Sequence, residues 1–276
     1  MPHQDNLMHI IEILCIGNEL LSGITLNTNV HWLSKKITRI GGFVRKVTVI
    51  RDDLDEINLA LTDSLKRKPS WIIVCGGLGP TYDDKTLQGI GKALKKNLVS
   101  DNIALEMVKK SYNDRHQKVK LNEARLKMAK IPVGSTPIQN PVGNAPAVLL
   151  SVNKTRIICL PGVPNEMKAI VLRSILPQIK EEIGNFTISE INYFVQGISE
   201  AMISSRLTKI VASAPNDKLY LKTHPQGYVN NNIPTIRIQI VSKGTKKEQV
   251  TRLLEKVSSQ LSTTIRKNNG KILKII

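Results

Sequence analysis

The sequence is poor in aromatic residues and in cysteine. Aromatic side chains make up 4% of its 276 residues, so a buried core has to be built from Ile, Leu, Val and Ala. The three cysteines form no C-x-x-C pair, and their odd number argues against a disulfide framework. Cys15, Cys75 and Cys159 each follow an apolar run. This placement favours small buried side chains at strand ends, with a nucleophile or a metal ligand as the alternative.

Long apolar runs and a secretion signal are also missing. No segment approaches the roughly 20 apolar residues that a membrane-spanning helix requires. The N-terminal segment, MPHQDNLMHI, lacks the basic start and the apolar run of a signal peptide. We therefore expect a cytoplasmic protein that has no membrane segment.

Acidic residues are outnumbered, since 40 Lys and Arg stand against 22 Asp and Glu and give a net charge of +18. Such a balance favours anionic ligands or surfaces without requiring nucleic acid. From residue 188 onward, 14 Lys or Arg and 5 Asp or Glu give +9, so half of the excess lies in the last third of the chain. A solvated basic surface is the simplest interpretation of this region.

Apolar and amphipathic segments alternate through the first two thirds of the chain. The patterns predict strands at 10–16, 43–50, 71–75, 147–152 and 155–160. They predict helices at 28–40, 56–67, 84–96, 101–117, 121–129 and 165–182, and a loop at 131–146. Apolar strands that alternate with amphipathic helices indicate an α/β fold, with a mostly parallel sheet covered by helices on both faces.

The order of elements changes after the segment IGNFT at 183–187. The patterns then predict strands at 188–196, 218–223 and 234–242, and helices at 198–212 and 246–266. This β-α-β-β-α order indicates a separate small α+β domain. We therefore predict two domains, 9–184 and 188–276.

The segment GGLGPTYDDKT, directly after the strand at 71–75, is the strongest candidate for a functional site. Ligands bind beyond the carboxyl ends of parallel strands. Glycines let several backbone amides turn toward one point, and the helix that follows adds its positive N-terminal end, so the segment suits a phosphate group. The candidate phosphate-binding residues are Gly76, Gly77, Gly79, Thr81 and Thr86.

Asp83 and Asp84 need a different explanation, because carboxylates repel phosphate. They suit a divalent cation such as Mg²⁺, which binds carboxylate and phosphate oxygens together. They also suit a general base that activates a water molecule. The alternative is that one of them caps the following helix.

Two other loops should lie on the same rim of the sheet. In the loop after the first strand, Glu19 could bind a metal or a ribose hydroxyl, or be a surface or capping residue. Asn27 and Asn29 could hydrogen-bond a ligand, with Asn27 as the cap of the following helix as the alternative. In the loop after the last strand, Gly162 and Glu166 stand at a helix start, with an ordinary proline-shaped turn as the alternative.

Four motifs resemble the N-terminal domain of CinA proteins, in order and in spacing: GNELLSGITLNTN, GGLGPTYDDKT, NPVGNAPA and LPGVPNEM. That domain has the MoaB/MogA molybdopterin-binding fold, and the resemblance runs from about residue 9 to 182. It implies a three-layer α/β domain. Residues 188–276 resemble, less sharply, the KH-like domain that follows it in CinA proteins.

The resemblance also implies a function. CinA-type domains are associated with metal-dependent hydrolysis of ADP-ribose to AMP and ribose 5-phosphate. MoaB/MogA relatives bind molybdopterin or its adenylate in molybdenum-cofactor synthesis, which is the alternative function. The resemblance makes Asp83 and Asp84 the catalytic and metal-binding pair. Around them it places Gly76, Gly77, Gly79, Thr81, Glu19, Asn29, Gly143, Asn144, Gly162 and Glu166. It also leads us to expect a homodimer or homotrimer.

Several residues depart from the family pattern. No nicotinamide mononucleotide deamidase domain follows within the sequence, so we do not expect deamidation. Asn18 stands where many relatives have Asp, and Ala147 stands where glycine is usual. The basic region lacks the G-x-x-G loop that clamps a nucleic-acid backbone, because Glu200 replaces the second glycine. Nucleic-acid binding is therefore the least favoured of the three functions.

Overall fold

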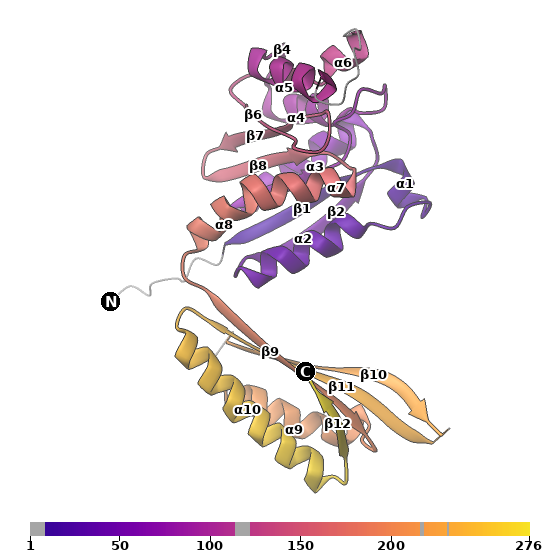
Figure 1. The fold of residues 1–276 in the computed structure, drawn as a ribbon, viewed down its shortest axis with the longest axis vertical. Coiled ribbons are helices and arrows are strands. Elements are labelled where there is room, and N and C mark those ends of the chain that lie inside the picture. The colour runs from indigo at the N-terminus through magenta and orange to yellow at the C-terminus, as the bar shows by residue number, and fades with distance from the viewer. Residues whose placement is uncertain (1–8, 114–121, 216–217, 231) are drawn as a thin grey trace. The chain divides into compact units, whose positions relative to one another are not determined.

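The computed structural model describes residues 9–113, 122–215, 218–230 and 232–276 (Figure 1). The chain divides into two compact units, residues up to 183 and residues 184–276. The boundaries predicted from sequence were 9–184 and 188–276. Within the described ranges, no helix is both long and apolar enough to cross a membrane.

A six-stranded sheet forms the centre of the first unit, in the order β2-β1-β3-β8-β7-β6. Four neighbouring strands run parallel, and β7 and β6 complete the sheet in antiparallel pairings. The strands are β1 (Ile10–Ile16), β2 (Phe43–Ile50), β3 (Trp71–Cys75), β6 (Thr136–Ile138), β7 (Ala147–Val152) and β8 (Thr155–Leu160). The predicted mostly parallel α/β sheet is confirmed.

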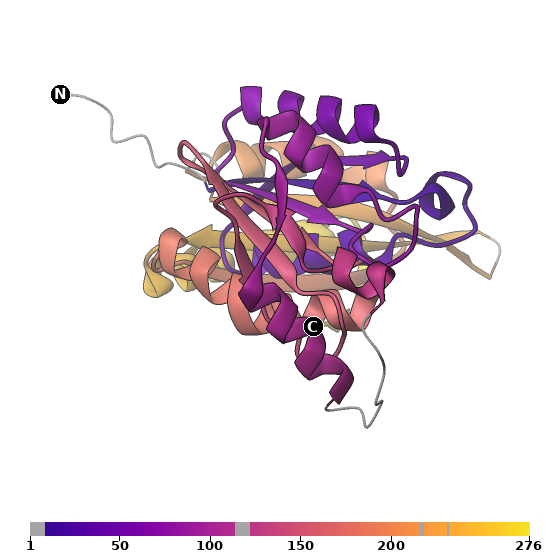
Figure 2. The same cartoon turned by 90° about the horizontal axis from the view of Figure 1, so that it is seen from above.

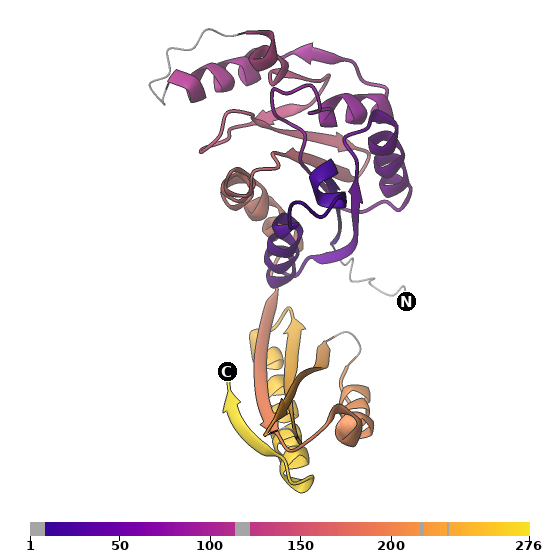
Figure 3. The same cartoon turned by 90° about the vertical axis from the view of Figure 1, so that its right-hand side faces the viewer.

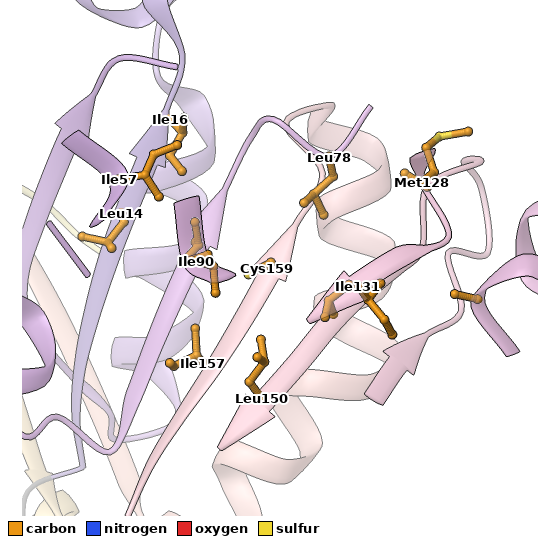
Figure 4. Close-up of a cluster of buried hydrophobic side chains, with 14 of the residues drawn as sticks. Leu14, Ile16, Ile57, Leu78, Ile90, Met128, Ile131, Leu150, Ile157 and Cys159 are labelled. Carbon is orange, nitrogen blue, oxygen red and sulfur yellow. The ribbon is translucent and has the colours of Figure 1, made fainter. Parts of the chain in front are cut away.

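Helices cover both faces of this sheet. Successive strand residues point to opposite sides, and here both sets are apolar, so each face packs against a layer of helices. Ile11, Ile13 and Cys15 of β1 pack with the helices of one layer, α2 (Thr28–Arg39), α7 (Pro164–Ile170) and α8 (Leu176–Ile183). Leu14 and Ile16 pack with those of the other layer, α3 (Leu54–Lys66), α4 (Thr86–Leu94) and α5 (Asn102–Asn113). Figure 2 and Figure 3 show the strands between the two layers, and Figure 4 shows the second cluster.

The helix predicted at 165–182 is interrupted by one wide turn. A π-helical segment, η1 (Val171–Ile175), joins α7 to α8. Pro177 explains the interruption, since proline has no N–H group and its ring clashes with the carbonyl group four residues earlier, that of Arg173. Widening the turn relieves that clash while the helical direction is kept.

Short elements differ most from the prediction. The segment predicted as a loop at 131–146 contains β6 and most of β5 (Lys130–Pro132), which pairs with β4 (Leu98–Ser100). The helix predicted at 121–129 is α6 (Glu123–Lys127), and a four-residue helix, α1 (Asn18–Leu21), follows β1. Strands of three residues are too short to display a period, which explains these errors. The predicted extension of α5 beyond residue 113 lies outside the described residues.

The second unit contains a four-stranded antiparallel sheet, in the order β10-β11-β9-β12. Its elements are β9 (Thr187–Gln196), α9 (Glu200–Ala212), β10 (Leu219–Val229), β11 (Ile233–Gly244), α10 (Lys247–Lys267) and β12 (Lys271–Ile275). Strand β12 was not predicted, and it completes the β-α-β-β-α-β order of a ferredoxin-like split βαβ. The resemblance to a KH-like domain stays a prediction.

Candidate functional site

A cavity of about 410 Å³ lies where β1, β3 and β8 of the first unit end. Its position agrees with the rule that parallel sheets bind ligands beyond the carboxyl ends of their strands. The structure brings nine of the predicted site residues to its lining: Glu19, Gly76, Gly77, Gly79, Asp83, Asp84, Asn144, Gly162 and Glu166. The other four, Asn29, Thr81, Thr86 and Gly143, do not line it.

The loop after β3 needs glycine at its first two positions. Gly76 and Gly77 have φ angles of +111° and +63°, which side-chain-bearing residues rarely adopt. The amide of Gly76 donates to the carbonyl of Leu160 at 3.0 Å, and a Cβ atom at Gly76 would lie 2.1 Å from the carbonyl oxygen of Ile16. The loop therefore starts in close backbone contact with both neighbouring strands.

Three consecutive amides of this loop are available to a ligand. In the described parts of the chain, the N–H groups of Gly77, Leu78 and Gly79 have no hydrogen-bond partner. All three residues line the cavity, and the buried Leu78 side chain anchors the loop in the core below. Successive amides in such a turn form an anion-binding concavity.

Thr86 braces the loop from behind. Its side chain is fully buried, and its hydroxyl group donates to the carbonyl oxygen of Gly76 at 2.7 Å. A Cβ atom at Gly77 would lie 2.3 Å from the Thr86 hydroxyl oxygen, so the first turn of α4 touches the loop. Because the single hydroxyl proton is used inside the protein, Thr86 has none to donate to a phosphate.

Asp84 closes the loop on itself. One of its carboxylate oxygens accepts hydrogen bonds from both the amide (2.8 Å) and the hydroxyl group (2.5 Å) of Thr81. A Cβ atom at Gly79 would lie 2.6 Å from the same oxygen. Thr81 is therefore tied to Asp84. Neither aspartate is the capping residue of α4, whose N-cap position is Lys85.

Asp83 lines the cavity as a carboxylate. Its pKa is lowered below the ordinary 3.8, first by the nearby Thr81 hydroxyl group, although that hydroxyl donates to Asp84 in this structure, then by its own backbone amide and by the charges of Lys127 and Lys85. Asp83 is therefore ionised at neutral pH. Lys127 of α6 also donates to the carbonyl oxygen of Thr81. No local pattern pointed to Lys127, because it lies 46 residues further along the chain than Thr81.

The NPVGNAPA segment is folded onto Glu166 by a residue that the sequence analysis missed. The buried Asn140 side chain donates to Glu166 at 2.7 Å and to the carbonyl oxygen of Ala145 at 3.0 Å, and it accepts from the Gly143 amide at 2.8 Å. A Cβ atom at Gly143 would lie 2.1 Å from the Glu166 carboxylate. Gly143 thus allows close packing. The signal was an asparagine that begins a glycine-containing turn.

Glu19 and Asp52 add two carboxylates to the cavity. The Glu19 carboxylate folds back over its own loop. It lies so close to Gly17 that a Cβ atom added there would be 2.5 Å from it. Asp52 accepts a hydrogen bond from the Asn18 amide at 2.9 Å and so caps α1. The sequence analysis missed Asp52, whose approach to α1 depends on the pairing of β2 with β1.

Asn29 connects two loops of the rim. Its side-chain amide donates to the carbonyl oxygen of Gly162 at 2.8 Å, across 133 residues of sequence. The Oδ1 atom of the Asn29 side chain is buried and has no hydrogen-bond partner in the described residues. Asn27 caps α2 by accepting from the Val30 amide at 3.2 Å, as one of the predicted alternatives has it.

The three cysteines are buried, as the sequence predicts. Burial raises the pKa of the Cys75 thiol well above its ordinary value and that of Cys159 to about 12. Burial likewise raises the pKa of the Cys15 thiol. Thiols in this environment stay protonated at neutral pH, which argues against a nucleophile or a metal ligand.

Replacement of Gly76 by alanine tests the loop geometry. We expect Gly76→Ala to abolish binding of inorganic pyrophosphate at the cavity, because the new Cβ atom would push the loop off the Ile16 carbonyl oxygen. Isothermal titration calorimetry measures the affinity. Gly23→Ala is the matched control, since Gly23 has a φ angle of +74° and no atom within 4 Å of the added Cβ. Equal affinity in the two variants would contradict the prediction.

Comparisons with known proteins cover both units. The family model described as probable molybdopterin binding domain matches residues 12–181. A protein of Metallosphaera sedula is 37% identical over 264 residues, which are 96% of this chain and 97% of that protein. A protein of Saccharolobus solfataricus is 37% identical over 259 residues, which are 94% of this chain and 93% of that protein.

One solved structure is similar in sequence as well. The crystal structure of the protein CinA, of unknown function, from Thermoplasma acidophilum is 39% identical to this chain, with a TM-score of 0.57. The match covers 65% of this chain and 100% of that structure. Because the family model matches more than half of the chain, the protein belongs to the molybdopterin-binding-domain family, and its first unit is of the CinA type.

Proposed function

We propose that the cavity binds a phosphorylated small molecule of the nucleotide or pterin class. The observation that carries the proposal is the row of three available amides, those of Gly77, Leu78 and Gly79, along a cavity of about 410 Å³. Ligand pockets in proteins typically measure roughly 300–1,000 Å³. The phosphate would accept hydrogen bonds from the amides, and the organic part would fill the rest of the cavity.

We further propose that the site hydrolyses a pyrophosphate bond, as in ADP-ribose. Asp83 is ionised, lines the cavity and lies four residues beyond the phosphate-binding amides. It can accept a proton from a water molecule whose oxygen attacks one phosphorus atom. The P–O bond to the second phosphate then breaks, and the second phosphate departs with the bridging oxygen. From ADP-ribose the products are AMP and ribose 5-phosphate.

A divalent cation fits this site only together with a ligand. Within the described residues, no group of three or more His, Cys, Asp or Glu side chains is arranged to hold a metal. The donors in the cavity are carboxylate oxygens, the type that Mg²⁺ prefers, and Mg²⁺ commonly binds one or two carboxylates plus substrate phosphates. The free oxygen of Asp84 would hold the cation, Asp83 would remain the base, and the cation would neutralise phosphate charge.

The second candidate function is binding or adenylation of a molybdopterin-like phosphate in molybdenum-cofactor synthesis. The family match to molybdopterin binding domains favours it. The cavity also contains the carboxylates of Glu19, Asp52 and Glu166, which can accept hydrogen bonds from the N–H groups of a pterin ring. The two functions share the phosphate position and differ in what happens to the phosphate.

A ligand panel separates them. The purified protein is incubated with ADP-ribose, other pyrophosphate-linked nucleotides and a pterin phosphate, with and without Mg²⁺, and products are resolved by chromatography. We expect release of AMP from ADP-ribose only when Mg²⁺ is present. Pterin binding without any turnover would support the second function instead. If no phosphorylated compound binds, both proposals are wrong.

A further inference from the structure

The sheet of the second unit has one face that no described helix of this unit covers. Helices α9 and α10 pack on the other face, where Ile236, Ile238 and Ile240 of β11 meet Tyr193 and Val195 of β9 in the core. Because strand residues alternate between faces, the residues between these positions point away from the helices. We call the uncovered surface of β9, β10, β11 and β12, formed by the residues that point away from α9 and α10, the open face.

The centre of the open face combines an aromatic ring with polar side chains. The strand register pairs Phe194 of β9 with Arg237 of β11, and the neighbouring Asn192 with Gln239. On the neighbouring strand β10, Tyr220 is half exposed and lies on the same face, opposite Val241. This face therefore presents rings for stacking beside hydrogen-bonding groups.

Its charge is strongly positive. The four strands carry five basic residues and one acidic residue. The basic residues are Lys222, Arg237, Lys243, Lys271 and Lys274. The acidic residue, Glu190, accepts hydrogen bonds from Asn192 and Gln239, both at 2.8 Å. Helices α9 and α10 carry seven basic residues and three acidic ones, a net charge of +4 that equals the net charge of the four strands. An anionic polymer is the electrostatic complement of the open face.

Two polar atoms at its centre lack partners. The Nε atom of Arg237 and the Oδ1 atom of Asn192 are buried and make no hydrogen bond within the described residues. Buried polar atoms are nearly always hydrogen-bonded in folded proteins. One of these atoms is a donor and the other an acceptor, so rotation of the two side chains toward the open face would let a ligand that offers both kinds of group satisfy them. Nucleobase edges offer both, whereas phosphate alone offers only acceptors.

From these observations we infer that the open face binds single-stranded nucleic acid. The phosphates would lie along the basic side chains, and a base would stack on Phe194. RNA-recognition domains likewise bind single strands on a four-stranded sheet, with aromatic residues that stack on the bases. This mode does not use a G-x-x-G loop. Glu200, which replaces the second glycine of that loop, is therefore no obstacle.

The test uses the full chain and a fluorescein-labelled dodecameric single-stranded RNA, with fluorescence anisotropy measured at several salt concentrations. Arg237→Gln/Lys243→Gln/Lys274→Gln removes three charges from the open face. We expect at least a tenfold loss of affinity, and a decrease of about 2 in the slope of log affinity against log salt. Phe194→Leu keeps an apolar side chain but removes the ring, and we expect about a fivefold loss or more.

A matched variant controls for total charge. Lys247→Gln/Arg252→Gln/Lys256→Gln removes the same charge from exposed positions of α10, and we expect affinity within about twofold of wild type. Each variant is also compared with wild type by circular dichroism and thermal unfolding, and unchanged curves show that the second unit is still folded. An equal loss in both triple variants would overturn the inference. So would equally tight binding of duplex RNA, or competition by polyglutamate as strong as that by unlabelled RNA.

Discussion

Asp83→Asn is expected to lower turnover of ADP-ribose by about 10²–10⁴-fold, the usual contribution of a general base, while affinity for the nucleotide changes little. The amide keeps the size of the side chain but cannot accept a proton from water. The amides of Gly77, Leu78 and Gly79, which are proposed to bind the phosphate, do not depend on it, because the loop is held by Thr86 and Asp84. Single-turnover kinetics and calorimetry measure the two effects separately.

Asp84→Asn is the informative comparison. Asp84 accepts two hydrogen bonds from Thr81, so its replacement loosens the loop and should weaken nucleotide binding as well as turnover. If Asp83→Asn impairs binding and Asp84→Asn impairs only turnover, the roles of general base and loop support are assigned to the wrong residues.

The pH dependence of the same reaction follows from the lowered pKa of Asp83. The base form is present above that pKa, so kcat/KM should stay level from neutral pH until the pH falls below 3.8. Thr81→Val removes the hydroxyl group that contributes most to the lowering, so the acidic limb should move toward 3.8. Nucleotide binding should weaken at the same time, because Asp84 loses one of its two hydrogen-bond donors. An acidic limb near neutral pH would exclude Asp83 as the base.

Glu12→Gln is expected to reduce the free energy of unfolding by about 3 kcal/mol at neutral pH. Glu12 lies on β1, is 1% exposed, and binds Arg45 and Arg67 at 2.6 and 2.7 Å. Burial by itself raises its pKa, but hydrogen bonds from Arg67, Ser64 and Arg45 outweigh burial and lower the pKa from 4.5 to about 2. The neutral amide would leave both guanidinium groups without their counter-charge.

The stability that Glu12 confers should depend on pH in a defined direction. Because the folded pKa is lowered, this contribution is fully present above pH 4.5 and is lost as the pH falls from 4.5 toward 2. Urea unfolding at several pH values measures the loss, and Glu12→Gln should remove that part of the pH dependence. Asp63→Asn, at an exposed ion pair with Lys66, should leave the unfolding midpoint unchanged. An identical acid sensitivity in wild type and Glu12→Gln would contradict this assignment.

The fold of the first unit could be predicted largely from sequence because its signals are local. Five apolar runs predicted the principal strands, and turn residues marked the loops at their carboxyl ends. Gly76, Gly77 and Asp83 could be assigned to one site because all the strand ends of a parallel sheet meet at one edge. Strands β4, β5 and β6 were not predicted, because each has only three residues and is too short to show an alternation of apolar and polar side chains.

The sequence by itself determined the two-part organisation, the α/β class and the position of the candidate phosphate-binding loop, because these depend on residue types and spacings within short segments. Tertiary structure alone decided that Thr86 braces the loop, that Asn140, Asp52 and Lys127 join the site, and that Phe194 and Arg237 share one open sheet face. Such roles rest on hydrogen bonds and strand pairings between distant segments. Only the packed chain brings those segments together.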